Sequence, residues 1–263
     1  MDLGLTGKTA IVTGGGSNIG RAISLAFAGE GANVVIAEID EAQGQKVVKE
    51  INALGARAIV VKMDVTNYAQ VEQMVKRTLD EFNRIDVLVN NVGWDDLMLF
   101  TETTPELWDK IISINYKGVL NCIKLVLPHF IEQKSGAIVN IGSDAGRIGE
   151  FREAVYGGCK GAVIAMSKAV AREVGRYGIR LNVVCPGVTT PTSSEEFGEA
   201  SMWQEGLKVY TPEVLEKVAK GMPLRKIGKA TDLASAVVFL ASDVAAGHIT
   251  GQTLSVSGGY SMM

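Results

Sequence analysis

The sequence lacks long apolar runs and runs of basic residues. No stretch approaches the ~18 apolar residues of a membrane span, and the N-terminus has no basic segment followed by an apolar core, as a secretion signal would. Lys and Arg number 26 against 29 Asp and Glu, which gives a net charge of −3. Nucleic acid and anionic membranes are therefore poor candidates as partners. We predict a cytoplasmic protein.

Cysteine and histidine are also scarce. The 3 cysteines are odd in number and widely spaced, which argues against a disulfide framework and against a CxxC zinc site. The only 2 histidines are His129 and His248, so a Ser-His-Asp hydrolase would have to take its histidine from a helix or a late loop. No cluster of His, Cys, Asp and Glu has metal-ligand spacing. We predict reduced thiols and no metal site.

The sequence does contain a regular alternation of short apolar runs with longer amphipathic stretches. The short runs predict strands at 8–13, 33–39, 58–62, 86–89, 137–141, 180–184 and 253–257. The stretches between them predict helices at 19–28, 41–54, 67–82, 105–131, 156–177 and 231–241. Such alternation implies a parallel sheet covered by helices on both faces. We predict an α/β fold of three layers, a doubly wound parallel sheet of Rossmann type, in a single domain spanning 1–263.

The segment 189–221 interrupts this alternation. It is richer in Ser, Thr and Glu and carries scattered bulky residues, among them Trp203 and Tyr210. An interruption of this length within a compact domain is more often functional than idle. We predict that it forms a helical lid over the substrate, with Trp203 as a substrate contact.

A glycine-rich loop, TGGGSNIG at 13–20, follows the first predicted strand and opens the first helix. Backbone N–H groups at a helix N-terminus attract a pyrophosphate, and glycine lets the backbone come close to it. The loop therefore predicts dinucleotide binding, although a structural turn would look similar.

Glu38 ends the second predicted strand and lies 24 residues after Gly14. A carboxylate at this position accepts hydrogen bonds from the adenosine ribose and repels a 2′-phosphate. We therefore predict NAD rather than NADP, with Asp40 as a weaker candidate for the same role. A solvated turn carboxylate is the alternative interpretation. Asp64-Val65 and Asn90–Gly93 follow the third and fourth strands, at the strand ends where such sheets bind ligands.

Tyr156 and Lys160 are four residues apart, so on a helix their side chains lie on the same face, and Ser143 arrives from a different element. A tyrosine acts as a base near neutral pH only if something favours phenolate, and a nearby ammonium does so. We predict a proton-transfer centre in which the Lys160 cation lowers the pKa of Tyr156, while hydride moves to or from a separate cofactor. An ordinary helix start with a packed tyrosine is the alternative.

These residues together resemble the short-chain dehydrogenase/reductase family over essentially the whole chain. TGxxxxIG at 13–20, NNVG at 90–93, Asn115, Ser143, YxxxK at 156–160 and PG at 186–187 occur in that family's order. The resemblance implies that Ser143 orients the substrate oxygen and that Tyr156 is the acid/base. It also implies that Lys160 holds the nicotinamide ribose and that Asn115 supports a water relay. The family commonly forms homotetramers through its long helices, and we expect the same here.

The resemblance also implies a set of cofactor-binding residues. They are Gly14, Ser17, Asn18, Ile19, Glu38, Asp64, Val65, Asn91, Val92, Gly93, Tyr156, Lys160, Pro186, Gly187, Val188 and Thr189. Two of them depart from the family pattern, since the family usually has glycine in place of Asn18 and alanine in place of Val92. Asparagine tolerates left-handed backbone geometry, so the loop can still form, with an added side-chain donor near the pyrophosphate.

The expected activity is NAD-dependent oxidation of a secondary alcohol to a ketone. NNVGWD at 90–95, SDAGR at 143–147 and EAVYGGCKG at 153–161 resemble family members that act on cyclic acyl-CoA in aromatic-ring degradation. A cyclic or otherwise bulky β-hydroxyacyl-CoA is therefore the expected small-molecule substrate, with Trp94, Asp95 and Asp144 as further contacts. Turn and lid packing is the alternative for these three. Basic residues should meet the phosphates of CoA, and the available set is Arg147, Arg152, Lys208, Lys217, Arg225 and Lys226.

Two other functions compete with this one. A 3-oxoacyl carrier-protein reductase that uses NADPH would share the scaffold and run in the opposite direction, but Glu38 argues against NADPH. A non-catalytic dinucleotide-binding subunit would share the fold, but the intact set of Asn115, Ser143, Tyr156 and Lys160 argues against it.

Overall fold

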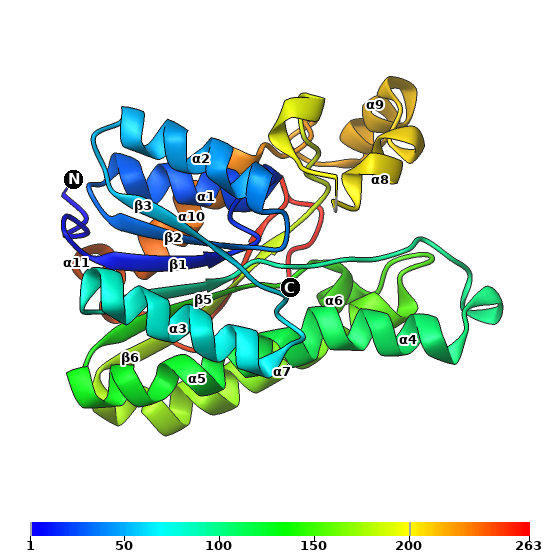
Figure 1. Ribbon diagram of the computed structural model, residues 1–263. Helices are drawn as coiled ribbons and strands as arrows, with labels where there is room; N and C mark the ends of the chain where they lie inside the picture. The colour runs from blue at the N-terminus through cyan, green and yellow to red at the C-terminus, as the bar shows by residue number, and fades with distance from the viewer. Residues whose placement is uncertain (1, 200) are drawn as a thin grey trace.

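The chain forms one seven-stranded parallel sheet (Figure 1). The structure is a computed structural model and describes residues 2–199 and 201–263. The strands are β1 (Thr9–Thr13), β2 (Asn33–Glu38), β3 (Ala58–Lys62), β4 (Val87–Asn90), β5 (Gly136–Ile141), β6 (Ile179–Pro186) and β7 (Thr253–Val256). Their order in the sheet is β3-β2-β1-β4-β5-β6-β7. The order reverses between β1 and β4, which is the point where doubly wound sheets bind ligands. The predicted strands and fold class are confirmed.

Helices cover both faces of the sheet. One layer contains α1 (Asn18–Gly29), α2 (Glu41–Ala53) and α10 (Ala230–Ala241), and the other contains α3 (Tyr68–Phe82), α5 (Gly118–Gln133) and α7 (Ala154–Val174). Side chains of a strand point alternately to the two faces. In β1, Ala10 and Val12 accordingly enter the core under α1 and α10, whereas Ile11 enters the core under α3 and α5. All seven strands end at one edge, which we call the carboxyl edge.

The helix predicted at 105–131 is interrupted. It begins as α4 (Pro105–Ile112), passes through a π-helical turn at Ser113–Lys117 and continues as α5. Such turns contain one residue more than an α-helical turn and occur frequently at functional sites. Immediately after the turn, Gly118 approaches Val65 so closely that a Cβ there would be 2.7 Å from Val65 Cγ2. The turn therefore fits a close contact between this helix and the connection after β3.

The segment predicted as a lid is largely helical. It contains a 3-10 turn at Ser194–Glu196, then α8 (Trp203–Val209) and α9 (Pro212–Gly221). Figure 1 shows α8 and α9 beyond the carboxyl edge on one side of the sheet, with α4 and the short α6 (Ala145–Ile148) on the other. In the parts of the chain that the structure describes, no helix combines the length and apolar character needed to cross a membrane.

Candidate active site

Four predicted residues meet at the carboxyl edge, around the ammonium of Lys160. Ser143 follows β5, Tyr156 and Lys160 lie on α7, and Asn115 lies in the π turn. Lys160 Nζ is 5.4 Å from the centroid of the Tyr156 ring. Gly93, three residues after β4, lies close to both Asn115 and Lys160. A Cβ at Gly93 would be 3.3 Å from Asn115 Oδ1 and 3.4 Å from Lys160 Nζ.

Lys160 is a buried ammonium held by the backbone. It is 2% exposed, and its Nζ donates a hydrogen bond of 2.9 Å to the carbonyl of Ile141. Burial lowers the pKa of Lys160 to about 8, since the charged form loses its hydration. Near neutral pH, this lysine is therefore more easily deprotonated than a solvated lysine.

The pKa of Tyr156 runs opposite to the prediction. It is raised above its ordinary value, with burial as the largest cause and the carboxylates of Glu153 and Asp95 as further causes. A hydrogen bond with Ser143 acts in the other direction but does not outweigh them. In this arrangement burial and the two carboxylates disfavour phenolate, so the net change in pKa is opposite to the predicted one. That Lys160 acidifies the phenol during the reaction stays a prediction. At neutral pH the phenol keeps its proton.

Asn115 uses its side chain to hold the segment that carries Trp94. Its Nδ2 donates to the carbonyl of Trp94 at 2.7 Å and to the carbonyl of Ile111 at 2.9 Å, and its Oδ1 accepts from the Trp94 N–H at 3.2 Å. The residue is fully buried. Its side chain is therefore occupied, and the water relay predicted for Asn115 would have to use its main-chain carbonyl.

The glycine-rich loop has the shape that a dinucleotide needs. Gly14 has a positive φ of 62°, and a Cβ on Gly20 would lie 2.0 Å from the Gly14 carbonyl oxygen, so only glycine fits there. Asn91 at the end of β4 ties the loop down, because its Nδ2 donates to the carbonyls of Thr13 and Gly14 at 3.0 and 3.2 Å. The N–H groups at the start of α1 follow directly, as phosphate binding requires. The loop fits a dinucleotide.

Glu38 lies against this loop. Its Oε2 accepts from Gly16 N at 3.0 Å, and its Oε1 accepts from Ile39 N and Asp40 N at 2.9 and 3.4 Å. Burial raises the pKa of Glu38, and the backbone donors oppose this rise. Asp40 is already used elsewhere, since its Oδ1 caps α2 by accepting from Gln43 N at 3.0 Å and its Oδ2 accepts from Glu199 N at 3.2 Å. Of the two predicted ribose ligands, Glu38 is therefore the one beside the loop.

The other predicted cofactor residues also follow strand ends. Asp64 stabilises the turn after β3, with its Oδ1 accepting from the N–H and hydroxyl of Thr66 at 2.8 Å. After β6, Thr189 pairs with Gly228, and Val188 accepts from Gly228 N at 3.1 Å. The structure thus brings the predicted set to one edge of the sheet. Their contacts with a cofactor remain a prediction.

Asp144 does not face a substrate, contrary to the prediction. Its carboxylate is 1% exposed, accepts from Ser255 Oγ at 2.7 Å and pairs with Arg147 at 3.4 Å. These contacts fix the start of α6 to β7. They also pair the Arg147 guanidinium with a carboxylate, and its predicted contact with CoA phosphates stays a prediction.

Trp94 and Trp203 are placed by contacts with neighbouring side chains. The ammonium of Lys110 lies 3.5 Å from the centroid of the Trp94 ring. The Trp203 ring in α8 packs against Tyr210, with the centroids 5.8 Å apart. Both tryptophans remain candidate substrate contacts, held in place by residues that the sequence pattern did not single out.

An acidic group beside Tyr156 was only partly foreseen. It comprises Asp95, Glu150 and Glu153, and burial raises the pKa of Asp95 to about 6 and that of Glu153 to about 7. One oxygen of Asp95 is buried without a hydrogen-bond partner among the described residues. Burial raises the pKa of Tyr210, and the same carboxylates raise it further, so the end of α8 faces this group. Glu153 was missed, although its position three residues before Tyr156 at a helix start was a signal.

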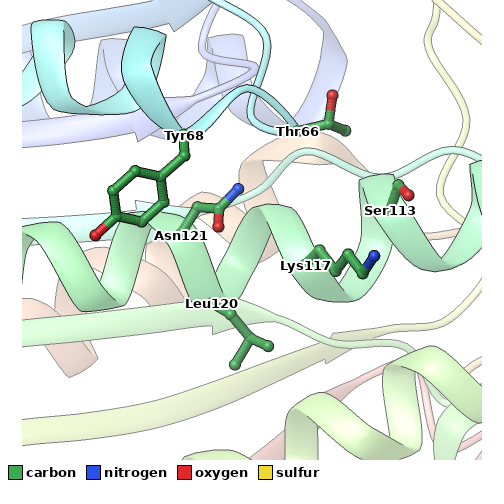
Figure 2. Close-up of a pocket in the computed structure, with 6 residues that line it drawn as sticks. All are labelled: Thr66, Tyr68, Ser113, Lys117, Leu120 and Asn121. Carbon is green, nitrogen blue, oxygen red and sulfur yellow. The ribbon is translucent and has the colours of Figure 1, made fainter.

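A separate hollow lies on the outer side of the π turn (Figure 2). It has a volume of about 370 Å³ and is lined by Thr66, Tyr68, Ser113, Lys117, Leu120 and Asn121. None of the predicted catalytic residues lines it. Among residues 2–199 and 201–263, no group of His, Cys, Asp and Glu side chains could hold a metal ion.

Comparisons with known proteins identify the family of the chain. A family model described as Enoyl-(Acyl carrier protein) reductase matches residues 14–261. A 3-oxoacyl-(acyl-carrier-protein) reductase of Synechocystis is 38% identical over 259 residues, covering 98% of each chain. The corresponding reductase of Staphylococcus epidermidis is 36% identical and covers 97% of this chain and 99% of its own. An uncharacterised oxidoreductase of Thermotoga maritima is 36% identical and covers 96% of this chain and 97% of its own.

These matches extend over nearly the whole chain, and the parallel sheet has the expected α/β architecture. The protein therefore belongs to the short-chain dehydrogenase/reductase family, as an oxidoreductase that acts on CH–OH groups with a nicotinamide dinucleotide.

Proposed function

We propose that the protein interconverts a 3-hydroxyacyl thioester and the corresponding 3-oxoacyl thioester, with NAD(H) as the cofactor. The names of the relatives support the substrate class, because several are 3-oxoacyl-(acyl-carrier-protein) reductases. The carboxylate of Glu38 supports NAD(H), since it lies against Gly16 in the loop and would repel a 2′-phosphate. This position of Glu38 is the observation that carries the cofactor choice.

The catalytic roles follow from the side chains around Lys160. The hydroxyl of Ser143 holds the substrate oxygen, and the phenol of Tyr156 gives that oxygen its proton on reduction or takes it on oxidation. Lys160, anchored on the Ile141 carbonyl, lies between Tyr156 and the segment at Gly93 and would hold the ribose of the cofactor. A bound nicotinamide supplies or accepts the hydride.

The protonation of Tyr156 decides which form of the phenol the free protein offers to a substrate. Burial and the neighbouring carboxylates raise its pKa, so the phenol is protonated at neutral pH. A protonated phenol can donate at once to a ketone oxygen, whereas it must first lose its proton to act as a base. Reduction of a 3-oxoacyl thioester, the reaction named in the relatives, uses the phenol in this protonated form.

A ring-bearing acyl-CoA is the second candidate substrate. NNVGWD at 90–95, SDAGR at 143–147 and EAVYGGCKG at 153–161 resemble 2-hydroxycyclohexanecarboxyl-CoA dehydrogenase, whose substrate is also a β-hydroxyacyl thioester. Trp94 beside Lys110 and Trp203 beside Tyr210 would supply flat apolar walls for a ring. The two candidates share the chemistry and differ in the acyl group and the carrier.

The test is a matrix of substrates and cofactors with purified protein. We expect the protein to reduce the acetoacetyl thioesters of CoA and of acyl carrier protein at least tenfold faster with NADH than with NADPH. A ring-bearing 3-oxoacyl-CoA should be the better substrate only if the second candidate holds. A tenfold preference for NADPH would overturn the cofactor choice, and turnover of free alcohols alone would overturn the thioester class.

A further inference from the structure

Asn18, the first residue of α1, has a backbone conformation that asparagine adopts only at a cost. Its φ is 42°, in the left-handed region where glycine is free of steric strain and other residues are not. It lies within the glycine-rich loop at 13–20, between Gly14 and Gly20. A side chain is therefore present at a point where the backbone would be more stable without one.

The side chain of Asn18 is also buried without full hydrogen bonding. The residue is 7% exposed, and its Oδ1 is buried with no partner among the described residues. A buried carbonyl oxygen that loses its water without gaining a donor destabilises the folded protein. Both the backbone and the side chain of Asn18 are thus unfavourable in the free protein, and strain of this kind concentrates where a ligand compensates it.

The surroundings of Asn18 identify what could compensate. It begins a helix of 12 residues whose first N–H groups attract anions, within the turn in which Gly20 approaches Gly14. The centre of a dinucleotide has phosphate oxygens next to ribose hydroxyls, which means acceptors next to donors. A carboxamide matches both, because its Nδ2 donates and its Oδ1 accepts.

We propose that the carboxamide of Asn18 is a ligand of the dinucleotide, with Nδ2 donating to the pyrophosphate and Oδ1 accepting from an adjacent ribose hydroxyl. This inference rests on the proposed function, in that a nicotinamide dinucleotide binds at the loop. It adds a side chain to a phosphate site that otherwise uses backbone N–H groups alone. Binding of the cofactor then removes the unpaired oxygen and offsets the backbone strain.

The test measures binding and stability separately for Asn18→Gly. Titration of NADH, followed by its fluorescence, should give a dissociation constant about tenfold higher than that of the natural protein, since a hydrogen bond to a charged group is lost. The melting temperature of the free variant should be equal or higher, because glycine relieves the backbone strain. Asn18→Asp, which keeps the acceptor, loses the donor and adds a negative charge, should weaken binding further.

Two controls distinguish a ligand from a loop-shaping residue. Asn83→Gly replaces another asparagine of positive φ, 59°, at the exposed end of α3. It should change the melting temperature in the same direction and leave the dissociation constant of NADH unchanged. Adenosine, which has a ribose but no phosphate, should lose less affinity for the Asn18→Gly variant than ADP-ribose does, because only the hydrogen bond to Oδ1 is removed. ADP-ribose should show the same loss as NADH.

Each outcome decides the proposal. A dissociation constant for NADH within twofold of the natural value in Asn18→Gly would overturn it, and so would an equal loss for adenosine, which would mean that Asn18 only shapes the loop. If the natural protein binds NADPH instead, the same comparison is made with NADPH and the cofactor choice alone falls. A natural protein that binds neither dinucleotide would overturn the proposed function together with this inference.

Discussion

The two halves of the carboxyl edge, the cofactor half around Glu38 and the substrate half around Tyr156, differ in how their carboxylates are hydrogen-bonded. Glu38 is buried, whereas Asp95 and Glu153 are half-buried. In the cofactor half, Glu38 accepts three backbone hydrogen bonds, which oppose the rise in pKa caused by burial. In the substrate half, Asp95 and Glu153 have pKa values of about 6 and 7, and one oxygen of Asp95 has no partner among the described residues. The carboxylate of the cofactor half thus has hydrogen-bond donors on both oxygens, whereas the substrate half contains carboxyl groups that change charge near neutral pH.

The largest expected effect tests the centre of the substrate half. Tyr156→Phe removes the hydroxyl that exchanges the proton, and general acid catalysis is worth a factor of about 10³ in kcat. We expect that loss in steady-state reduction of a 3-oxoacyl thioester, with the dissociation constant of NADH unchanged within twofold. The half-buried ring remains in place, so the fold should hold. A variant with natural turnover would mean that Tyr156 has no acid role and that the proton comes from elsewhere.

Glu153 gives the second largest effect, on stability. Its pKa rises from 4.5 to about 7 on folding, so the folded state binds the proton more tightly than the unfolded state. The stabilisation from this proton is full below pH 4.5 and is lost as the pH rises through about 7. Glu153→Gln cannot lose a proton, so at pH 8 it should be more stable by about 2 kcal/mol, a figure reduced for partial exposure.

Urea unfolding of Glu153→Gln and the natural protein at pH 5 and pH 8 measures this effect. The groups that face Glu153 are Asp95 and Glu150 in the acidic group, with Tyr156 on α7 and Tyr210 after α8. The exposed Glu132 at the end of α5 provides the control, since Glu132→Gln should leave the pH dependence unchanged. If the free energy of unfolding had the same pH dependence in Glu153→Gln and in the natural protein, Glu153 would not titrate near neutral pH, and the contrast with Glu38 would fail.

Local patterns predicted the strands, most helices and the cofactor half. Each strand is marked in the sequence by a short apolar run. The loop at 13–20 and Glu38 lie close together in the sequence, on consecutive elements from β1 to β2. The π turn at Ser113–Lys117 was missed, because an extra residue in one turn leaves the apolar pattern of the helix nearly unchanged. The pairing of Asp144 with Ser255 and the approach of Asp95 to Glu153 join distant segments, which no local pattern reports.

Glu38→Gln tests the cofactor half and should have a smaller effect. Glutamine keeps an oxygen that can accept from Gly16 N and removes the negative charge, so a 2′-phosphate is no longer repelled. We expect the preference for NADH over NADPH to fall about tenfold, measured as the ratio of the two kcat/KM values. Asp40→Asn, which keeps the cap of α2 while removing a charge two residues away, should leave the ratio within twofold. Equal effects of both variants would mean that general charge around the loop, rather than Glu38, selects the cofactor.

The smallest expected effect concerns the hydrogen bonding of Asp144, and it tests the comparison of the two halves directly. It lies in the substrate half, beside Ser143, but its bonding resembles that of Glu38, with both the Ser255 hydroxyl and Arg147 as partners. Ser255→Ala removes one of these partners, and we expect a loss of about 1 kcal/mol in the free energy of unfolding, with KM for the thioester unchanged within twofold. A change in KM without a change in stability would instead place Asp144 in contact with the substrate. In that case, the hydrogen-bond partners of a carboxylate would not distinguish a structural carboxylate such as Asp144 from one that contacts the substrate.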